Sequence, residues 1–267
     1  MLRGPAGHPI RSYRKDHFVD IFAFPLIAAL LGAVYWFVEF IASLLEPFAG
    51  AAGPALAIVV LTMLVRTLLI PVGISQVKAE WTRRRLAPKL RALQLRYKKK
   101  PEVLQRKMAE FYKAENASPL AGILPSLAQA PVISLVYALF VRGTIGGHAN
   151  LLLAASLGGV PLGTSLMTAG LSVTGVAWPG ILMFGCLLLV LAVTAWLPRR
   201  IANRFAMPVD APAAARLAAV LSWLPFITVV FAAVVPLAAT IYLATTTTWT
   251  LIERAILRRR YGGSAGV

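Results

Sequence analysis

Long apolar stretches separated by polar segments divide this sequence. They lie at 21–45, 55–73, 120–141 and 178–197, and a final stretch runs from 217 to 252. Each of the first four is close to the roughly 20 residues that an α-helix needs to cross the hydrocarbon core of a bilayer. Only 14% of the residues are charged and 58% are hydrophobic, whereas soluble domains average about 25% charged residues. The sequence therefore predicts an all-α polytopic membrane protein.

The final apolar stretch is too long for one straight span, because its 36 residues would form a helix of about 54 Å at about 1.5 Å per residue. Pro225 and Pro236 interrupt it, and proline breaks the hydrogen-bond ladder of a helix. We therefore expect a hairpin of two short spans that turns near 234–236.

Basic residues predict the orientation of the spans. The segment 76–117 contains thirteen Lys or Arg residues, and 198–216 and 254–267 contain four each. The alternate segments 46–54 and 143–177 contain none. By the positive-inside rule, the three basic segments, including the C-terminus, lie in the cytoplasm.

These signals divide the chain into ten segments, four of which contain the five core spans. They are a basic N-terminal tail (1–20), an N-terminal apolar helix (21–48), the first core span (55–75), a cytoplasmic helical hairpin (76–117), the second core span (118–142), an extracytoplasmic loop (143–177), the third core span (178–197), a cytoplasmic loop (198–216), the hairpin of the fourth and fifth core spans (217–253) and a basic cytoplasmic tail (254–267). The N-terminal apolar helix is either a sixth span or a helix along the outer membrane interface, and the sequence favours neither.

Apolar residues recur at helical spacing in the cytoplasmic segment. One set is Leu86, Leu90, Leu93 and Tyr97, and a second set after the KKKP stretch (98–101) is Leu104, Met108 and Phe111. This pattern predicts two amphipathic helices that form an antiparallel hairpin. Glu80 with Arg84, and Glu102 with Arg106, are i,i+4 pairs that would support these helices.

The basic side chains of the hairpin are candidates for contact with partners. They are Arg83, Arg84, Arg85, Lys98, Lys99 and Lys100, and the RRRY stretch (258–261) adds to them. Ribosomal RNA and anionic lipid headgroups are the two alternatives, and anchoring to headgroups is the simpler role.

Arg66 lies in the middle of an apolar segment. A central arginine costs about 2.5–3.5 kcal/mol on the insertion scale. The stretch 55–73 contains eleven Leu, Ile or Val residues that each contribute up to about −0.6 kcal/mol, so the span tolerates it. An ion pair with Glu39 or Glu253 is one alternative, but neither is expected at the depth of Arg66. We therefore favour a water-filled cavity that opens to the cytosol.

Polar residues in other spans are candidates for the walls of this groove. They are Gln129, which lies between Pro125 and Pro131, and Thr245, Thr246, Thr247, Thr248 and Thr250 in the last span. A single threonine more often bonds to its own helix, but several near an arginine favour a groove. Tyr242 and Trp249 are either groove residues or interfacial anchors.

Several of these features together resemble the YidC/Oxa/Alb family of membrane protein insertases, particularly its actinobacterial members. They are Arg66 with Pro71 five residues later, LAPKLRALQLRYKKKPEVLQRKMAEFYK (86–113), ASPLAGILPSLAQAPVISLVYALF (117–140), FAFPL (22–26) and VVPLAATIYLATTTTW (234–249). The threonine run stands where many relatives have asparagines.

The resemblance implies an insertase in the plasma membrane of a bacterium, with a five-span core. It also implies a hydrophilic groove in the inner leaflet that contains Arg66 and is closed toward the outside. The implied partners are nascent membrane proteins, the ribosome and the Sec translocon. In such a groove Arg66 would attract the acidic tail of a nascent chain.

Other function classes lack support in the sequence. There is no GxxxxGK loop and no HExxH motif, and His8, His17 and His148 are too far apart to suggest a metal site. We therefore expect neither an enzyme nor a cofactor. The net charge of +17 would suggest nucleic acid for a soluble chain, but in a membrane protein its placement matters more, and we expect no DNA partner. The alternative function is a small transporter or channel for an anionic solute.

Overall fold

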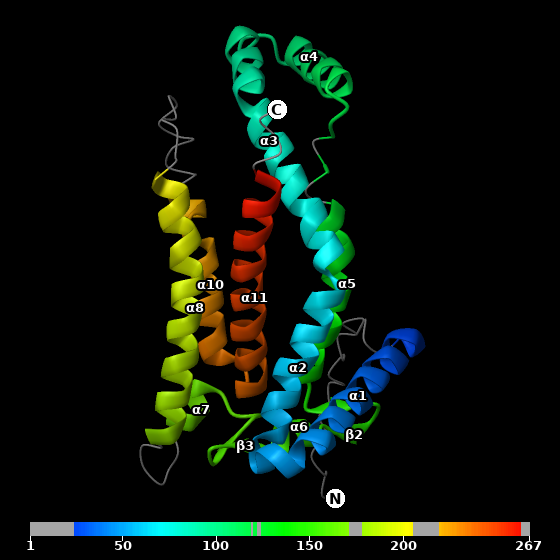
Figure 1. The fold of residues 1–267 in the computed structure, drawn as a ribbon, viewed down its shortest axis with the longest axis vertical. Helices are drawn as coiled ribbons and strands as arrows, with labels where there is room; N and C mark the ends of the chain where they lie inside the picture. Colours follow the sequence, from blue (N-terminus) through cyan, green and yellow to red (C-terminus); the bar gives the residue numbers. More distant parts are fainter. Residues whose placement is uncertain (1–23, 119, 122–123, 171–177, 205–218, 263–267) are drawn as a thin grey trace, which may run out of the picture.

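The computed structural model of the chain describes residues 24–118, 120–121, 124–170, 178–204 and 219–262. The basic N-terminal tail (1–20) and most of the cytoplasmic loop (198–216) lie outside these residues. Figure 1 shows an elongated bundle of helices. We call its two ends the strand end, where short strands lie at 144–161, and the hairpin end, where the helix at 101–114 lies.

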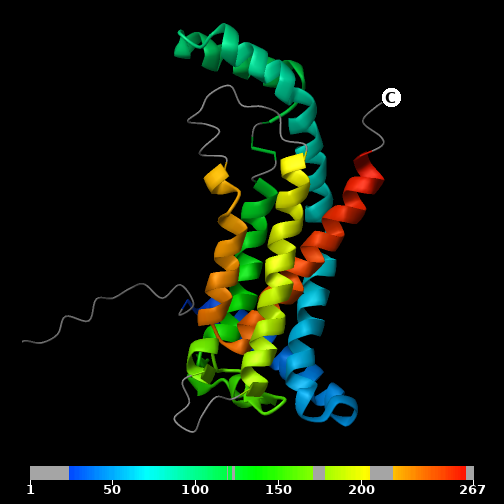
Figure 2. The ribbon, with the colours of Figure 1, turned by 90° about the vertical axis from the view of Figure 1, so that its left-hand side faces the viewer.

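The described residues are mostly helical, as the composition predicts. The helices are α1 (Pro25–Ala49), η2 (Gly50–Ala52), α2 (Gly53–Leu68), α3 (Ile70–Arg96), α4 (Pro101–Ala114), α5 (Leu124–Val141), α6 (Leu151–Ala154), α7 (Leu166–Gly170), α8 (Trp178–Arg204), α10 (Leu224–Val234) and α11 (Leu237–Gly262). The strands are β1 (Thr144–Ile145), β2 (His148–Ala149), β3 (Ser156–Leu157) and β4 (Val160–Pro161). Figure 2 shows α8 and α10 running along the long axis of the bundle, with α11 inclined across them.

Helices α2 and α3 are separated by Leu69 alone. The break follows from Pro71, which has no N–H to donate to the carbonyl four residues earlier and which suits the first turn of a new helix. From Ile70, α3 continues without interruption to Arg96. The boundary expected at 75–76, between the first core span and the cytoplasmic hairpin, is therefore not a structural break. Pro88 lies inside α3. Figure 2 shows that the part of α3 at the hairpin end turns sideways.

Two small β-hairpins form most of the strand end. β1 pairs with β2 and β3 pairs with β4, each through a Gly-Gly turn in which both glycines have positive φ. That conformation is required by tight type I′ turns and strains any residue with a Cβ. The loop also binds the start of α11, because Leu237 N–H donates to Thr164 O at 2.8 Å and Ala238 N–H donates to Leu162 O at 2.9 Å. These donors have no partner within their own helix.

The main hydrophobic core lies toward the strand end. It joins fully buried side chains from α2, α5, the loop and α11, such as Ile58, Phe140, Leu162 and Leu237. Large apolar side chains elsewhere face outward, and Trp36, Leu189 and Val230 are each more than 60% exposed. By length and apolarity, Pro25–Leu68 and Trp178–Ile201 are long enough to cross a membrane. Gln129–Val141 and Ala219–Val234 are shorter apolar helices. These apolar helices are consistent with a membrane protein.

Helix α1 is inclined to the long axis and lies beside the strand end (Figure 1). Leu31, Val38 and Ile41 bury one face of α1 in the main core. The Tyr35 hydroxyl accepts a hydrogen bond from Leu151 N–H at 3.2 Å, which ties α1 to the loop. α1 therefore supports the strand end of α2 and lies away from the hairpin end.

Candidate functional site

Arg66 lies in the last turn of α2 and is half buried. Its Nε–H donates a hydrogen bond to Thr246 Oγ1 on α11, at 2.6 Å. Among the residues that the structure describes, no carboxylate forms an ion pair with Arg66. The Nε–H of the guanidinium is therefore satisfied by a neutral hydroxyl rather than by a carboxylate.

A small polar cavity lies beside Arg66, between α2, α3, α5 and α11. Its polar lining residues are Arg66, Gln76, Gln129, Thr250, Glu253 and Arg254. The cavity volume of about 20 Å³ exceeds the roughly 10–15 Å³ that one water molecule needs, so it holds about one water. In this conformation the site is a narrow polar pocket rather than a wide groove.

Gln129 is one of the sequence candidates that reach this cavity. It is buried on α5, and its Oε1 accepts a hydrogen bond from Gln76 Nε2 on α3, at 3.3 Å. Sequence reasoning missed Gln76 because it assigned residue 76 to the cytoplasmic hairpin. Because α3 continues past Gly73, Gln76 lies one turn further along the same helix, and both residues line the cavity.

The threonine run does not face the cavity as a unit. Thr246 binds Arg66 and Thr250 lines the cavity, and these two residues are one helical turn apart. Thr245 and Thr247 donate instead to the carbonyls of Ile241 and Leu243 in their own helix, and neither lines the cavity. Thr248 is half buried and does not line it either. The reason is geometric, because successive helical residues are about 100° apart and four in a row point in all directions.

The two aromatic candidates have different environments. Tyr242 is buried, and its ring centroid lies 5.8 Å from that of Phe140 and 6.4 Å from that of Tyr137, both on α5. It belongs to the bundle interior rather than to an interfacial belt. Trp249 is half buried, and its Nε1–H donates to Glu253 Oε2 at 3.1 Å.

Glu253 lines the same cavity as Arg66, which sequence reasoning did not expect. It follows Thr246 by seven residues, or about 10 Å along the helix. Its Oε1 is buried and has no hydrogen-bond partner. The only signal in the sequence was the i,i+7 spacing of Thr246 and Glu253, which puts both on one helix face.

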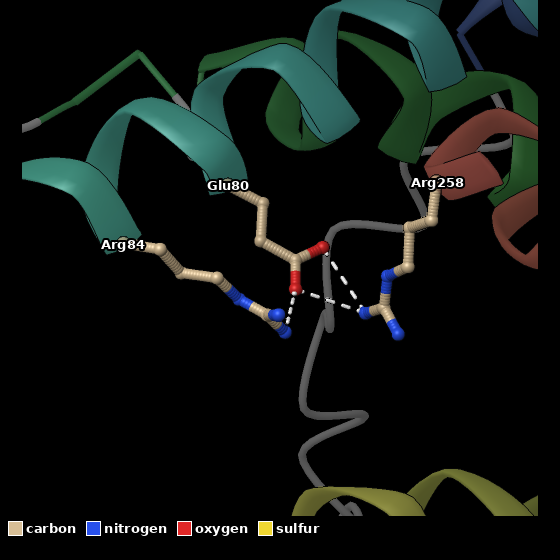
Figure 3. Close-up of polar contacts among 3 residues, drawn as sticks. All are labelled: Glu80, Arg84 and Arg258. Carbon is tan, nitrogen blue, oxygen red and sulfur yellow. Dashed lines mark hydrogen bonds and ion pairs between the residues drawn. The ribbon is translucent and has the colours of Figure 1, made fainter. Parts of the chain in front are cut away.

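At the hairpin end, an ion-pair cluster joins α3 to α11. Figure 3 shows the Glu80 carboxylate between two arginines: Arg84 Nη2 donates to Oε1 at 2.7 Å, and Arg258 Nη2 donates to Oε1 and Oε2 at 2.9 and 3.1 Å. The expected pair of Glu80 with Arg84 therefore forms, and it extends to the last helix. Arg106 has its Nε 4.0 Å from Glu110 Oε1, rather than forming the pair expected with Glu102.

The other basic candidates of the hairpin divide into paired and exposed groups. Arg85 and Lys89 of α3 approach Glu115, at 3.6 and 2.7 Å, and tie α3 to the end of α4. The hydrogen bond from Lys89 lowers the pKa of Glu115 below its ordinary value. The exposed group consists of Arg83, Lys98, Lys99 and Lys100. These four side chains are accessible to a partner.

The fold and the cavity are those of a helical protein with apolar outer faces and a polar pocket between its helices. The sequence model of the 60Kd inner membrane protein family matches residues 44–264, which is most of the chain. The chain therefore belongs to this family, which confirms the resemblance to YidC insertases.

Several curated relatives carry the name membrane protein insertase YidC. The protein from Clostridium perfringens is 38% identical over 101 residues, which is 38% of this chain and 42% of that protein. The Helicobacter pylori protein is 34% identical over 118 residues, covering 44% of this chain and 20% of the relative. The Xylella fastidiosa protein is 32% identical over 127 residues, covering 48% of this chain and 21% of the relative. The chain thus spans less than half the length of these relatives.

Proposed function

We propose that this protein is an insertase that inserts nascent membrane proteins into a bacterial plasma membrane and helps them fold. The observation that carries the proposal is the environment of Arg66. A half-buried cation without an ion-pair partner among the described residues, next to a polar cavity, attracts acidic groups in a chain that enters the bundle. Membrane protein insertases are also what the names of the relatives state.

In this proposal the strand end lies outside the cell and the hairpin end lies in the cytosol. The basic residues of α3, α4 and the end of α11 support this orientation by the positive-inside rule. The packed apolar core toward the strand end supports a closed outer side. The polar pocket then opens on the cytosolic side as a groove.

The mechanism that we propose lowers the barrier to moving a polar tail. In bare hydrocarbon each unsatisfied polar group costs several kcal/mol. The groove hydrates the tail part of the way, and Arg66 attracts its carboxylates. Burial of about 20 apolar residues of the substrate in lipid then drives insertion, without a nucleotide or a metal.

A polypeptide is much larger than the present cavity of about 20 Å³, so the groove must widen before it admits a substrate. The elements that separate in this proposal are α11 on one side and α2, α3 and α5 on the other. The Arg66–Thr246 bond and the Arg258–Glu80 pair join these two sides, and they are the polar contacts that widening must break or stretch.

Partners follow from the exposed basic residues. Arg83, Lys98, Lys99 and Lys100 form an exposed basic group on α3 and the turn that follows it. We propose that it contacts anionic lipid headgroups and the ribosome, and that the protein also works beside the Sec translocon.

The test is insertion by the full chain reconstituted in liposomes. The substrate is a translated single-span protein with a short acidic tail, and protection of the tail from added protease measures insertion. Replacing Arg66 by Ala should reduce insertion at least fivefold, and R66K should retain part of it. Thr245→Val is the matched control, because that hydroxyl bonds to its own helix. Insertion by R66A at the wild-type level would refute the attraction model.

A second candidate, transport of an anionic solute, rests on the same unpaired arginine. It requires a path across the bundle, whereas the cavity beside Arg66 holds about one water. Flux of a small anion into the same liposomes, without insertion of the test protein, would favour it.

A further inference from the structure

The proposed attraction of acidic tails leaves one buried group of the cavity without a role. Glu253 has one carboxylate oxygen occupied by Trp249 Nε1–H, at 3.1 Å. The other, Oε1, is buried without a hydrogen-bond partner. An unsatisfied buried acceptor is costly, and more so when it is charged. Such a group is retained where a ligand or a water molecule satisfies it.

Gly73 provides a second, independent observation at the same place. Glu253 Oε1 lies directly against this residue of α3, and a Cβ added there would overlap the oxygen and come within 3.0 Å of Glu253 Cδ. Glycine inside a helix costs about 0.5–1 kcal/mol relative to alanine. The chain thus has an unfavourable residue at the position that makes room for the carboxylate.

The cavity therefore contains groups of both signs. Arg66 and Arg254 are cationic, and Glu253 is anionic. Glu253 forms no ion pair with Arg66, although both line a space that holds about one water. With the carboxylate ionised, the formal charge of the lining is one positive unit rather than two. A lysine or arginine that enters is then repelled less than by two cations alone and has an acceptor for its N–H groups.

We propose that Glu253 is a second anchor of the groove, which binds hydrogen-bond donors of the substrate and so sets which tails the protein accepts. This inference rests on the proposed insertase function. Its substrate class is polypeptide segments with Lys, Arg, Asn or Gln side chains, in addition to the acidic segments that Arg66 attracts. Trp249 holds the carboxylate through Oε2, and Gly73, which also lines the cavity, leaves room for Oε1 beside α3.

The test compares three substrates that differ only in the tail, which carries two Asp, two Asn or two Lys residues. Wild-type protein should insert all three into liposomes. Glu253→Gln keeps the size of the side chain and removes its charge. It should lower the ratio of Lys-tail to Asp-tail insertion at least fivefold. Glu46→Gln, a carboxylate on α1 away from the cavity, is the matched control and should change no ratio.

Gly73→Ala tests the same idea without changing Glu253. The new methyl group displaces the carboxylate, so the ratio of Lys-tail to Asp-tail insertion should fall as in E253Q. Gly32→Ala is its control, because a Cβ at that glycine of α1 meets nothing within 4 Å. Detergent-solubilised protein should show that each variant is folded. If E253Q does not fold, G73A decides the question.

The outcomes are distinct. The role of Glu253 would be overturned if E253Q and G73A reduced insertion of all three substrates equally, or if the ratio of Lys-tail to Asp-tail insertion did not change. The insertase function would still stand. Failure of the wild-type protein to insert even the Asp tail would overturn the insertase function, and this inference with it.

Discussion

Replacing Thr246 by valine tests the contact that holds Arg66 against α11. The change keeps the branched shape of the side chain and removes the acceptor that lies 2.6 Å from Arg66 Nε. Thr246 is only 7% exposed, so bulk water does not replace the lost hydroxyl. A hydrogen bond to a charged group contributes about 1.5–3 kcal/mol to stability. We expect T246V to lower the free energy of unfolding by about this amount.

The neighbouring residue provides a matched control. The Thr245 hydroxyl donates to Ile241 O in its own helix, at 2.9 Å, and such bonds compete with the backbone ladder. T245V should therefore change the free energy of unfolding by no more than about 0.5 kcal/mol. Denaturant unfolding in mixed micelles, followed by circular dichroism, measures both variants. Equal destabilisation by the two substitutions would refute the reasoning.

A double-mutant cycle isolates the contact itself. Arg66→Met removes the donor, T246V removes the acceptor, and the double variant removes both. Because the two side chains touch, the coupling energy should be at least about 1 kcal/mol. A coupling energy near zero would mean that the bond does not hold α2 to α11.

Three further predictions concern the rest of the fold. Glu80→Gln weakens the half-exposed ion pair with Arg258. The free energy of unfolding should fall by about 1 kcal/mol or less, but hydrogen exchange in the last two turns of α11 should increase. Unchanged exchange there would exclude the pair as a link between α11 and α3. The hydrogen bond from Lys89 lowers the pKa of Glu115 from 4.5, so the stability that this pair gives to the hairpin is complete above pH 4.5 and is lost as pH falls through the lowered pKa. Hydrogen exchange in α4 should therefore rise as pH falls through this range. E115Q should abolish this pH dependence of exchange. Gly158→Ala places a Cβ at a φ of +56°, which should destabilise the strand end by about 1 kcal/mol and lower the thermal midpoint; an unchanged midpoint would contradict the turn assignment.

The helical nature of the chain and its apolar stretches were predictable because both depend on local signals. Hydrophobicity over about 20 residues decides which segments suit a bilayer. Proline marks where helices restart: α3 begins next to Pro71, and α11 follows Pro236. Family membership was predictable for the same reason, because it rests on motifs that are continuous in the sequence.

The candidate site was predictable only in part, because a list of polar residues does not say which helix face each one occupies. Thr246 and Thr250 reach the polar pocket, whereas Thr245 and Thr247 bond to their own helix. The continuity of α3 was not predicted either, since no local signal at 75–76 shows that a helix continues from an apolar into a basic environment.

The sequence by itself determined that this chain places an arginine in an apolar helix, that its helices suit a membrane, and that its basic residues gather in alternate segments. Only the tertiary structure decided which residues contact that arginine. The crossing of α2, α3 and α11 brings Thr246 against Arg66 and Glu253 against Gly73, over separations of 180 residues in each case. Such contacts depend on how helices pack across long stretches of chain, and neither hydropathy nor helical spacing encodes that packing.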